Sequence, residues 1–149
     1  MTKVIDCFEN EWKVFRNPYH IYIEYEDIVF PSTEHAYHAA KSTNMDFRRS
    51  LVDLPWNEAR QRGRATKLRP GWEDGLKLQV MEEVNLIKYT TNKFCYDKLM
   101  STRGYELIEG NWWGDRYWGV CNGVGENHLG LILMKIRQRL EAGDTYVEF

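Results

Sequence analysis

This sequence of 149 residues has few cysteines and little net charge. The cysteines, Cys7, Cys95 and Cys121, are odd in number and far apart, so we expect reduced thiols rather than a disulfide framework. The net charge of −2 argues against a protein that coats nucleic acid non-specifically, although a local basic cleft remains possible. We therefore expect partners to be recognised locally.

Long apolar runs are also missing. No stretch approaches the roughly 18 apolar residues that a membrane-spanning helix needs, and charge interrupts residues 1–6 too early for a signal peptide. A composition that is 43% apolar and 28% charged, without a visible linker or repeat, is ordinary for a globular protein. We expect a single domain over residues 1–149, located in the cytoplasm and without a membrane partner.

One stretch, residues 30–41, carries the clearest local signals. Pro31 ends a strand, and Ser32 is a good helix N-cap because its hydroxyl can accept a hydrogen bond from an amide of the first turn. At about 100° per residue, small residues gather on one helix face, Ala36, Ala39 and Ala40. The other face carries chemical groups, Glu34, His38 and Lys41. We expect the alanines to be buried and the chemical face to line a cleft, although ordinary solvated charges are the alternative.

The remaining periodicities predict an α+β fold, mostly helical, with a small antiparallel sheet. Alternation over residues 19–25, resumed at 28–30, predicts a hairpin whose turn lacks its usual glycine. The sheet would combine the N-terminal strands with a strand over residues 105–109. Helices are expected over residues 45–54, 56–64 and 72–89, and from about residue 127 until Gly143. The last two helices each carry an apolar stripe that we expect to be buried: Leu76, Val80, Met81, Val84 and Ile87 in one, and Leu129, Ile132, Leu133, Ile136 and Leu140 in the other.

Two further segments have the composition of a ligand site. A basic run follows residue 59, where planar guanidinium groups could pair with phosphate oxygens, although a solvated helix face is the alternative. Residues 111–119 hold three tryptophans and a tyrosine around Asp115. We interpret this segment as a loop that lines a pocket, with Trp118 stacking on a planar group. A structural plug over the core is the alternative.

A glycine-rich approach to the last helix suggests an anion site. Gly123 and Gly125 lead to Asn127, a good N-cap residue, and free amides at a helix N-terminus attract anions. We expect this helix start and the aromatic loop to form opposite walls of one pocket. The glycine spacing does not fit a Rossmann fingerprint.

Four blocks in matching order, covering roughly residues 8–140, resemble the NADAR superfamily of YbiA-like N-glycosidases. They are P-S-x-E-H-x-Y-x-x-x-K from Pro31 to Lys41, A-x-x-x-G-R with R-x-x-W from Ala59 to Trp72, D-x-x-W-G from Asp115 to Gly119, and G-x-G-x-N-x-L-G with L-M-x-x-R from Gly123 to Arg137. The chain departs from the family pattern at Arg16, His38 and Ser42, which bears on substrate preference.

The resemblance implies a hydrolase that cleaves a ribosyl C1′–N bond. It would release ADP-ribose from a modified nucleobase such as guanine, or cleave a phosphoribosylamine intermediate of riboflavin biosynthesis. The partner would thus be a nucleotide-like small molecule or ADP-ribosylated nucleic acid. A non-catalytic binder of NAD or ADP-ribose is the alternative. No cofactor is implied, and no metal, because the histidines and cysteines show only a lone H-x-x-H.

The resemblance also implies the roles of individual residues. The catalytic residues would be Lys41, Glu34 and Asp115. Lys41 would attack C1′ to form a Schiff base, or would stay charged while Glu34 or Asp115 activates water. The substrate-binding residues would be Asn17, Ser32, His38, Arg64, Arg69, Trp72, Glu109, Trp118, Gly119, Gly123, Gly125 and Asn127.

Overall fold

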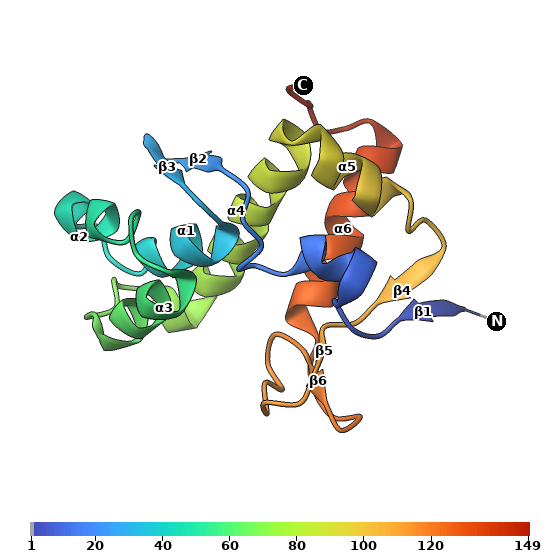
Figure 1. The fold of residues 1–149 in the computed structure, drawn as a ribbon, viewed down its shortest axis with the longest axis horizontal. Helices are drawn as coiled ribbons and strands as arrows, with labels where there is room; N and C mark the ends of the chain where they lie inside the picture. The colour runs from blue at the N-terminus through green and yellow to red at the C-terminus, as the bar shows by residue number, and fades with distance from the viewer. Residues whose placement is uncertain (1) are drawn as a thin grey trace. The chain divides into compact units, whose positions relative to one another are not determined.

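The computed structural model describes residues 2–149, which divide into two units (Figure 1). The middle unit is the segment Asn17–Lys88, and the terminal unit combines residues 2–16 with Tyr89–Phe149. Each unit is richer in helix than in strand. The fold class is therefore α+β and mostly helical, as the sequence predicts, while one domain over residues 1–149 stays a prediction.

The middle unit begins with a hairpin and continues with helices. Its elements are β2 (Ile23–Tyr25), β3 (Ile28–Phe30), α1 (Thr33–Ala39), α2 (Met45–Ser50), α3 (Trp56–Ala65), the 3₁₀ turn η2 (Trp72–Asp74) and α4 (Leu76–Thr91), whose last turn belongs to the terminal unit.

The hairpin forms without a glycine in its turn. β2 and β3 pair antiparallel, with Ile23 opposite Phe30 and Tyr25 opposite Ile28. Glu26 and Asp27 both take positive φ angles, 46° and 71°, as a type I′ turn requires. The strands are shorter than the alternation predicts, because β2 starts only at Ile23.

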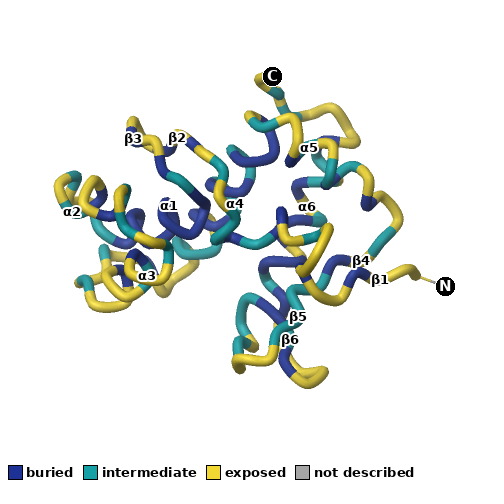
Figure 2. Tube along the Cα trace, in the orientation of Figure 1, coloured by how far each residue is buried: buried dark blue, intermediate teal, exposed yellow. Residues whose placement is uncertain are grey.

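Local signals around α1 are confirmed. Ser32 is extended, and its Oγ accepts a hydrogen bond from the His35 amide at 3.1 Å. The three alanines of the small face, Ala36, Ala39 and Ala40, are fully buried. Figure 2 shows α1 as a buried helix. However, α1 ends at Ala39, so Lys41 lies in the turn that follows the helix rather than on its face.

Glycine also shortens the longest predicted helix. Trp72–Asp74 forms a separate 3₁₀ turn, because Gly75 has a φ of 107° and interrupts the chain before Leu76. The apolar stripe of α4 is confirmed by the burial of Val80, Met81 and Val84.

The helix predicted over residues 45–54 is also shorter than expected, because α2 ends at Ser50.

The terminal unit consists of short strands, two helices and a 3₁₀ helix. Its elements are β1 (Lys3–Ile5), η1 (Asn10–Phe15), α5 (Lys93–Met100), β4 (Tyr105–Leu107), β5 (Gly110–Asn111), β6 (Val120–Cys121) and α6 (His128–Ala142). The α6 stripe is buried as predicted, through Leu129, Ile132, Leu133, Ile136 and Leu140. Arg137 at the edge of α6 donates to the carbonyls of Thr102 at 2.7 Å and Tyr105 at 2.8 Å, which fixes the chain before β4.

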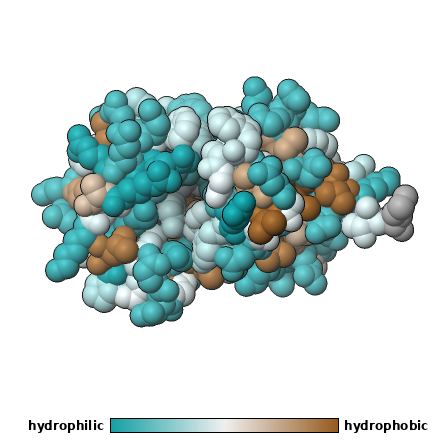
Figure 3. Space-filling view, turned by 90° about the horizontal axis from the view of Figure 1, so that it is seen from below, coloured by the Kyte–Doolittle hydropathy of each residue, from teal (hydrophilic) through white to brown (hydrophobic). Residues whose placement is uncertain are grey.

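The predicted antiparallel sheet is wrong in two respects. β4 pairs with β1 in parallel, Lys3 opposite Tyr105 and Ile5 opposite Leu107, and the hairpin forms a sheet of its own. Parallel strands need a long connection, and here more than 90 residues separate the two strands. Residues 2–149 contain no helix long and apolar enough to cross a membrane. The face of the molecule seen in Figure 3 is mainly hydrophilic, with apolar side chains in separate patches.

Candidate active site

The chemical face of α1 is buried in the middle unit. Glu34 is 6% exposed, and one of its oxygens, Oε1, accepts hydrogen bonds from His38 Nε2 at 3.0 Å and Arg60 Nε at 2.9 Å. Lys41 is 9% exposed. The interpretation of Glu34 and Lys41 as ordinary solvated charges is therefore wrong, and buried charges of this kind are typical of functional sites.

The surroundings of Glu34 keep it ionised. Burial would raise its pKa, but the hydrogen bond and charge of His38 and the positive charge of Arg60 outweigh burial and lower the pKa to about 2. At neutral pH the carboxylate can therefore accept a proton and has none to give.

The surroundings of Lys41, in contrast, favour its uncharged form. Burial, and next the positive charge of Arg64, lower its pKa to about 8, against the opposing effect of Glu34 and Glu73. About a tenth of the Lys41 side chains are then free amines at pH 7. The Nζ atom lies 5.5 Å from the centre of the Tyr37 ring. Lys41 is thus a chemically competent amine near neutral pH.

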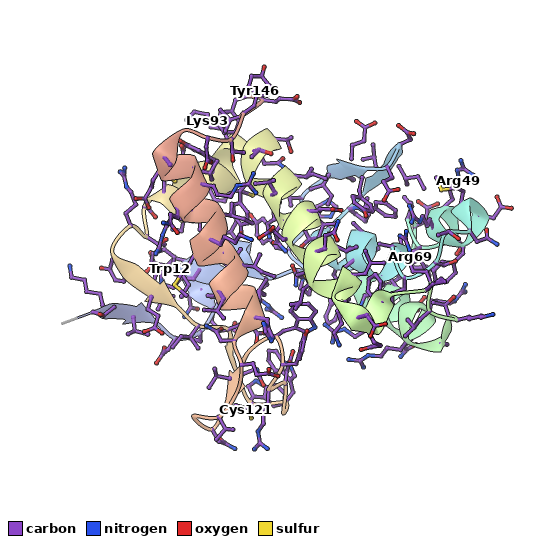
Figure 4. All side chains as sticks on the ribbon, turned by 180° about the vertical axis from the view of Figure 1, so that it is seen from behind. Trp12, Arg49, Arg69, Lys93, Cys121 and Tyr146 are labelled. Carbon is purple, nitrogen blue, oxygen red and sulfur yellow. The ribbon has the colours of Figure 1, made fainter. Side chains whose placement is uncertain are left out.

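Arg69, one of the predicted phosphate contacts, holds the turn that carries Lys41. Its amide donates to the Lys41 carbonyl at 2.9 Å, and its Nη1 donates to the Ala40 carbonyl at 3.4 Å. Figure 4 labels Arg69 among the helices of the middle unit. Arg64 is exposed on α3, so its guanidinium group is accessible to solvent. Phosphate binding by Arg64 and Arg69 stays a prediction.

The His38 side chain packs directly against Gly63 of α3, which is the glycine of the A-x-x-x-G-R motif. Because Nε2 donates to the Glu34 carboxylate, Nδ1 carries no hydrogen in the neutral ring, and this buried atom has no partner within the described residues. A Cβ at Gly63 would overlap Nδ1 and lie 2.7 Å from the His38 Cβ. α3 therefore approaches α1 closely only because position 63 has no side chain.

We expect Gly63→Ala to destabilise the protein by about 1–3 kcal/mol, because the extra methyl group overpacks the α1–α3 contact. The free energy of unfolding in urea measures the effect, with Gln61→Ala on the exposed side of α3 as the control. A helix-interior glycine-to-alanine change without a clash would instead stabilise the protein by up to about 1 kcal/mol. A stabilised Gly63→Ala variant would therefore contradict this account.

Three predicted substrate contacts also support α1 itself. The Asn17 carbonyl accepts from the Glu34 amide at 3.0 Å, and its Oδ1 accepts from Thr33 Oγ1 at 2.8 Å. Ser32 Oγ lies 2.6 Å from His35 Nδ1 in addition to capping the helix. Trp72 is buried against Tyr37, with ring centroids 5.3 Å apart. The roles of Asn17, Ser32 and Trp72 in substrate binding stay predictions.

The aromatic loop between β5 and β6 belongs to the terminal unit. Asp115 Oδ1 accepts from the amides of Tyr117 at 3.1 Å and Trp118 at 2.9 Å, which closes a tight turn. Asn111 holds the same turn, since its Oδ1 accepts from the Asp115 amide and its Nδ2 donates to the Asp115 carbonyl. Trp112 is 85% exposed, so the loop as a whole is not a plug over the core.

Glycines let this loop fold back on itself. A Cβ at Gly119 would overlap the Glu109 carboxylate and carbonyl, and a Cβ at Gly125 would overlap the Gly119 carbonyl. Gly123 has a φ of 76° in the turn after β6. These glycines, and Glu109, which also accepts from Asn111 Nδ2 at 3.1 Å, have structural roles. Their contact with substrate stays a prediction.

Asn127 takes the N-cap position of α6 as predicted, but without a capping hydrogen bond, and the predicted anion site is wrong. Asn127 has a φ of 55° and makes no capping hydrogen bond; its side chain instead accepts from the Glu109 amide and donates to the Leu107 carbonyl, both at 2.9 Å. The amides of residues 127, 128 and 129 donate to carbonyl groups of the loop, those of Gly119, Tyr117 and Trp118 respectively. The helix start and the loop are thus bonded to each other, and these amides are not open to an anion.

Arg60 belongs to the basic run considered for phosphate, but its actual partner, the Glu34 carboxylate, was not predicted. The sequence contains a signal for Arg60, because Trp56 and Arg60 are four residues apart on one helix and can stack. Their contact is present, with the guanidinium carbon 4.7 Å from the Trp56 ring centre. The long-range partner Glu34 has no such local signal.

Comparisons with known proteins agree with this architecture. The NADAR domain model matches residues 3–141. N-glycosidase YbiA of Escherichia coli (strain K12) is 32% identical over 122 residues, 79% of this chain and 75% of that protein. N-glycosidase Npun_R5314 of Nostoc punctiforme is 32% identical over 144 residues, 90% of this chain and 85% of that protein.

A solved structure and a plant relative extend the comparison. The NMR structure of E. coli YbiA matches with a TM-score of 0.85 and 26% identity, over 97% of this chain and 88% of that chain. A riboflavin biosynthesis protein of Zea mays, PYRR, is 28% identical over 161 aligned positions, 93% of this chain and 25% of that protein. The bacterial relatives are named N-glycosidases, which confirms the prediction of a hydrolase. The chain belongs to the NADAR domain family.

Proposed function

We propose that the protein hydrolyses a ribosyl C1′–N bond, with Lys41, Glu34 and Asp115 as its catalytic residues. The observation that carries the proposal is that the middle unit holds both a lysine amine that is partly neutral near pH 7 and a carboxylate that is fully ionised there. The pKa of Lys41 is about 8, and the pKa of Glu34 is about 2. An amine that is partly uncharged near neutral pH is the group that attacks an electrophilic sugar carbon.

The proposed reaction begins with the free amine of Lys41. In the opened ribose C1′ carries a protonated C1′=N bond, and Nζ adds to C1′ while the π electrons of that bond move to the substrate nitrogen. The C1′–N bond then breaks with its electron pair leaving on that nitrogen, as the Nζ lone pair forms the C=N bond of the Schiff base. Glu34 takes a proton from the attacking amine and passes it to the departing nitrogen. The sugar then remains on Lys41 as a Schiff base. Asp115 takes a proton from water as the water oxygen adds to C1′, and returns this proton to Nζ; the C1′–Nζ bond then breaks, which frees the Lys41 amine and releases the sugar as its aldehyde.

The substrate would be one of two nucleotide-like classes. A phosphoribosylamine opens to an imine or aldehyde at C1′, which suits attack by an amine, and the name of the Zea mays relative supports a riboflavin intermediate. An ADP-ribosylated guanine, in a nucleotide or a nucleic acid, would use Trp118 for stacking and Arg64 for phosphate. Both classes share the C1′–N bond that the proposed chemistry requires.

Incubation with three compounds tests the proposed function. These are DNA that carries ADP-ribosylated guanine, a ribosylaminouracil phosphate and NAD, each followed by chromatography of the products. We expect release of free sugar phosphate or ADP-ribose from one of the first two. If all three stay intact while ADP-ribose binds, the protein is a binder and the proposed hydrolysis is wrong.

We expect Trp118→Ala to weaken ADP-ribose binding by about 1–3 kcal/mol, the contribution of one stack between a base and an aromatic ring. Trp118 is half-buried, and its ring meets those of Tyr117 and His128 edge-on, with ring centroids 4.9 Å and 6.4 Å apart. Calorimetry measures the affinity, and Trp112→Ala in the same loop is the matched control. Equal affinities for a folded Trp118→Ala variant and the parent protein would remove Trp118 from the binding site.

A further inference from the structure

The two oxygens of the Glu34 carboxylate have different surroundings. Oε1 accepts both hydrogen bonds, from His38 Nε2 and from Arg60 Nε. No residue of the middle unit donates to Oε2. A carboxylate that is held by two donors through one oxygen has a fixed orientation, and its second oxygen is left to take the proton that the reaction transfers.

Arg60 is itself held in place. Its guanidinium carbon lies 4.7 Å from the centre of the Trp56 ring, one helical turn earlier on α3, and its side chain is 32% exposed. Stacking on an aromatic ring fixes the plane of the guanidinium group. The direction of the Nε–H bond, and so the position of the Glu34 oxygen that accepts it, therefore depends on Trp56.

We propose that Arg60, braced by Trp56, is a positioning residue that works together with His38 to hold Oε1 of Glu34, so that Oε2 is the oxygen that accepts the proton in the reaction. This inference rests on the proposed function of Glu34 as a proton acceptor, and it assigns Arg60 and Trp56 a role that the sequence did not predict for them. The other titratable groups that interact with Glu34 are His35 and His38 on α1 and Lys41 in the turn after α1; burial lowers the pKa of each of the three.

The need for two donors follows from the torsions of a glutamate side chain. The last torsion of Glu, which turns the carboxylate, has broad minima, so one hydrogen bond leaves the two oxygens free to exchange positions. His38 is on the same helix as Glu34, whereas Arg60 comes from α3. A donor from a second helix supplies a fixed point that motion of α1 alone does not remove. Loss of Arg60 should thus loosen the carboxylate and also remove a positive charge.

The test compares Arg60→Gln, Trp56→Leu and Arg60→Lys with the parent enzyme. We expect Arg60→Gln to lower kcat by on the order of 10- to 100-fold, the effect of a misplaced catalytic group, with KM almost unchanged. We expect Trp56→Leu to lower kcat less, because the charge stays. Arg60→Lys should restore the charge but not the planar Nε donor, so kcat should stay low. Arg49→Gln, on α2 and paired with Asp46, is the charge-matched control (Figure 4).

A pH profile separates positioning from plain structural support. Removal of Arg60 should raise the pKa of Glu34 by about 1–3 pH units. The activity of Arg60→Gln relative to the parent enzyme should therefore fall as the pH drops below about 5, because only the variant then loses the ionised carboxylate, and Arg60→Lys should restore this part of the profile. An increase in KM with an unchanged profile would mean that Arg60 binds the substrate, which would overturn the proposal.

A readout without catalysis distinguishes failure of this inference from failure of the proposed function. Carbon NMR of the labelled Glu34 carboxyl group reports its pKa directly in the parent protein and in each folded variant. We expect the pKa to rise in Arg60→Gln and to stay unchanged in Arg49→Gln. An unchanged Glu34 pKa in Arg60→Gln would refute the inference even in an active enzyme. A raised Glu34 pKa in a protein that cleaves none of the substrates would support the positioning of Glu34 by Arg60 but refute the proposed hydrolysis.

Discussion

Lys41→Ala is expected to abolish turnover, lowering kcat by on the order of 10³-fold or more, the scale seen when a covalent nucleophile is lost. Lys41→Arg should fail almost as completely. Arginine keeps the positive charge but its guanidinium group does not deprotonate near neutral pH, and so it forms no Schiff base. Steady-state kinetics on the cleaved substrate measure both effects. A Lys41→Arg variant with near-normal kcat would show that Lys41 acts only through its charge.

The pH dependence has opposite signs for the two possible roles of Lys41. A nucleophile needs the neutral amine, which gains population as the pH rises through the pKa of about 8. In that case kcat/KM should increase roughly tenfold per pH unit from pH 6 to 7.5 and level off above about pH 8.5. A charged clamp needs the ammonium form, and kcat/KM would then stay nearly constant from pH 6 to 7.5 and fall only above about pH 8. The profile of the parent enzyme therefore separates the two roles before any residue is changed.

Borohydride gives a direct test of the Schiff base. Reduction during turnover should leave a stable secondary amine between the sugar and Lys41, detected by peptide mass spectrometry and absent from Lys41→Ala. The exposed Lys67 in the same protein serves as an internal control for unspecific reaction with sugar aldehydes. Adducts spread equally over Lys67 and Lys41 would contradict a covalent role for Lys41.

The parts of the fold that the sequence predicts correctly depend on neighbouring residues. The Ser32 cap, the buried alanine face of α1 and the apolar stripe of α6 all follow from contacts within one or two helical turns. The errors arise where distant segments meet. The direction of β4 depends on its pairing with β1, about 100 residues earlier, and nothing in the sequence of either strand distinguishes parallel from antiparallel pairing.

The candidate site divides in the same way. Residue types and the family resemblance point to Glu34 and Lys41, because a carboxylate and a lysine near the end of one short helix are visible in the sequence. Their pKa values are set by burial and by Arg60 and Arg64 from another helix. Asn127 shows the reverse case: its sequence context predicts a cap, yet loop carbonyls occupy the amides of the helix start, and its side chain joins two segments instead. At this position the long-range hydrogen bonds outweigh the local tendency of asparagine to cap a helix.

Asp115 has a structural role and a proposed catalytic role, and one substitution separates them. Its Oδ1 accepts the two amides that close the turn of the aromatic loop. Asp115→Asn keeps an oxygen at this position but removes the negative charge. If Asp115 activates water, we expect kcat to fall by about 10²- to 10⁴-fold, with the melting temperature nearly unchanged. Asp115→Ala should lose activity as well, and should also lower the melting temperature, because two backbone amides lose their acceptor.

The comparison of these two variants decides what Asp115 does. If Asp115→Asn keeps near-normal turnover while Asp115→Ala is destabilised, then Asp115 only stabilises the turn of the aromatic loop and has no catalytic role. Both proton transfers would then fall to Glu34, and Glu34→Gln would be the one carboxylate substitution that stops the reaction. Glutamine keeps an oxygen for His38 and Arg60 to bind, so the loss of activity would reflect the missing proton acceptor rather than a disrupted helix contact.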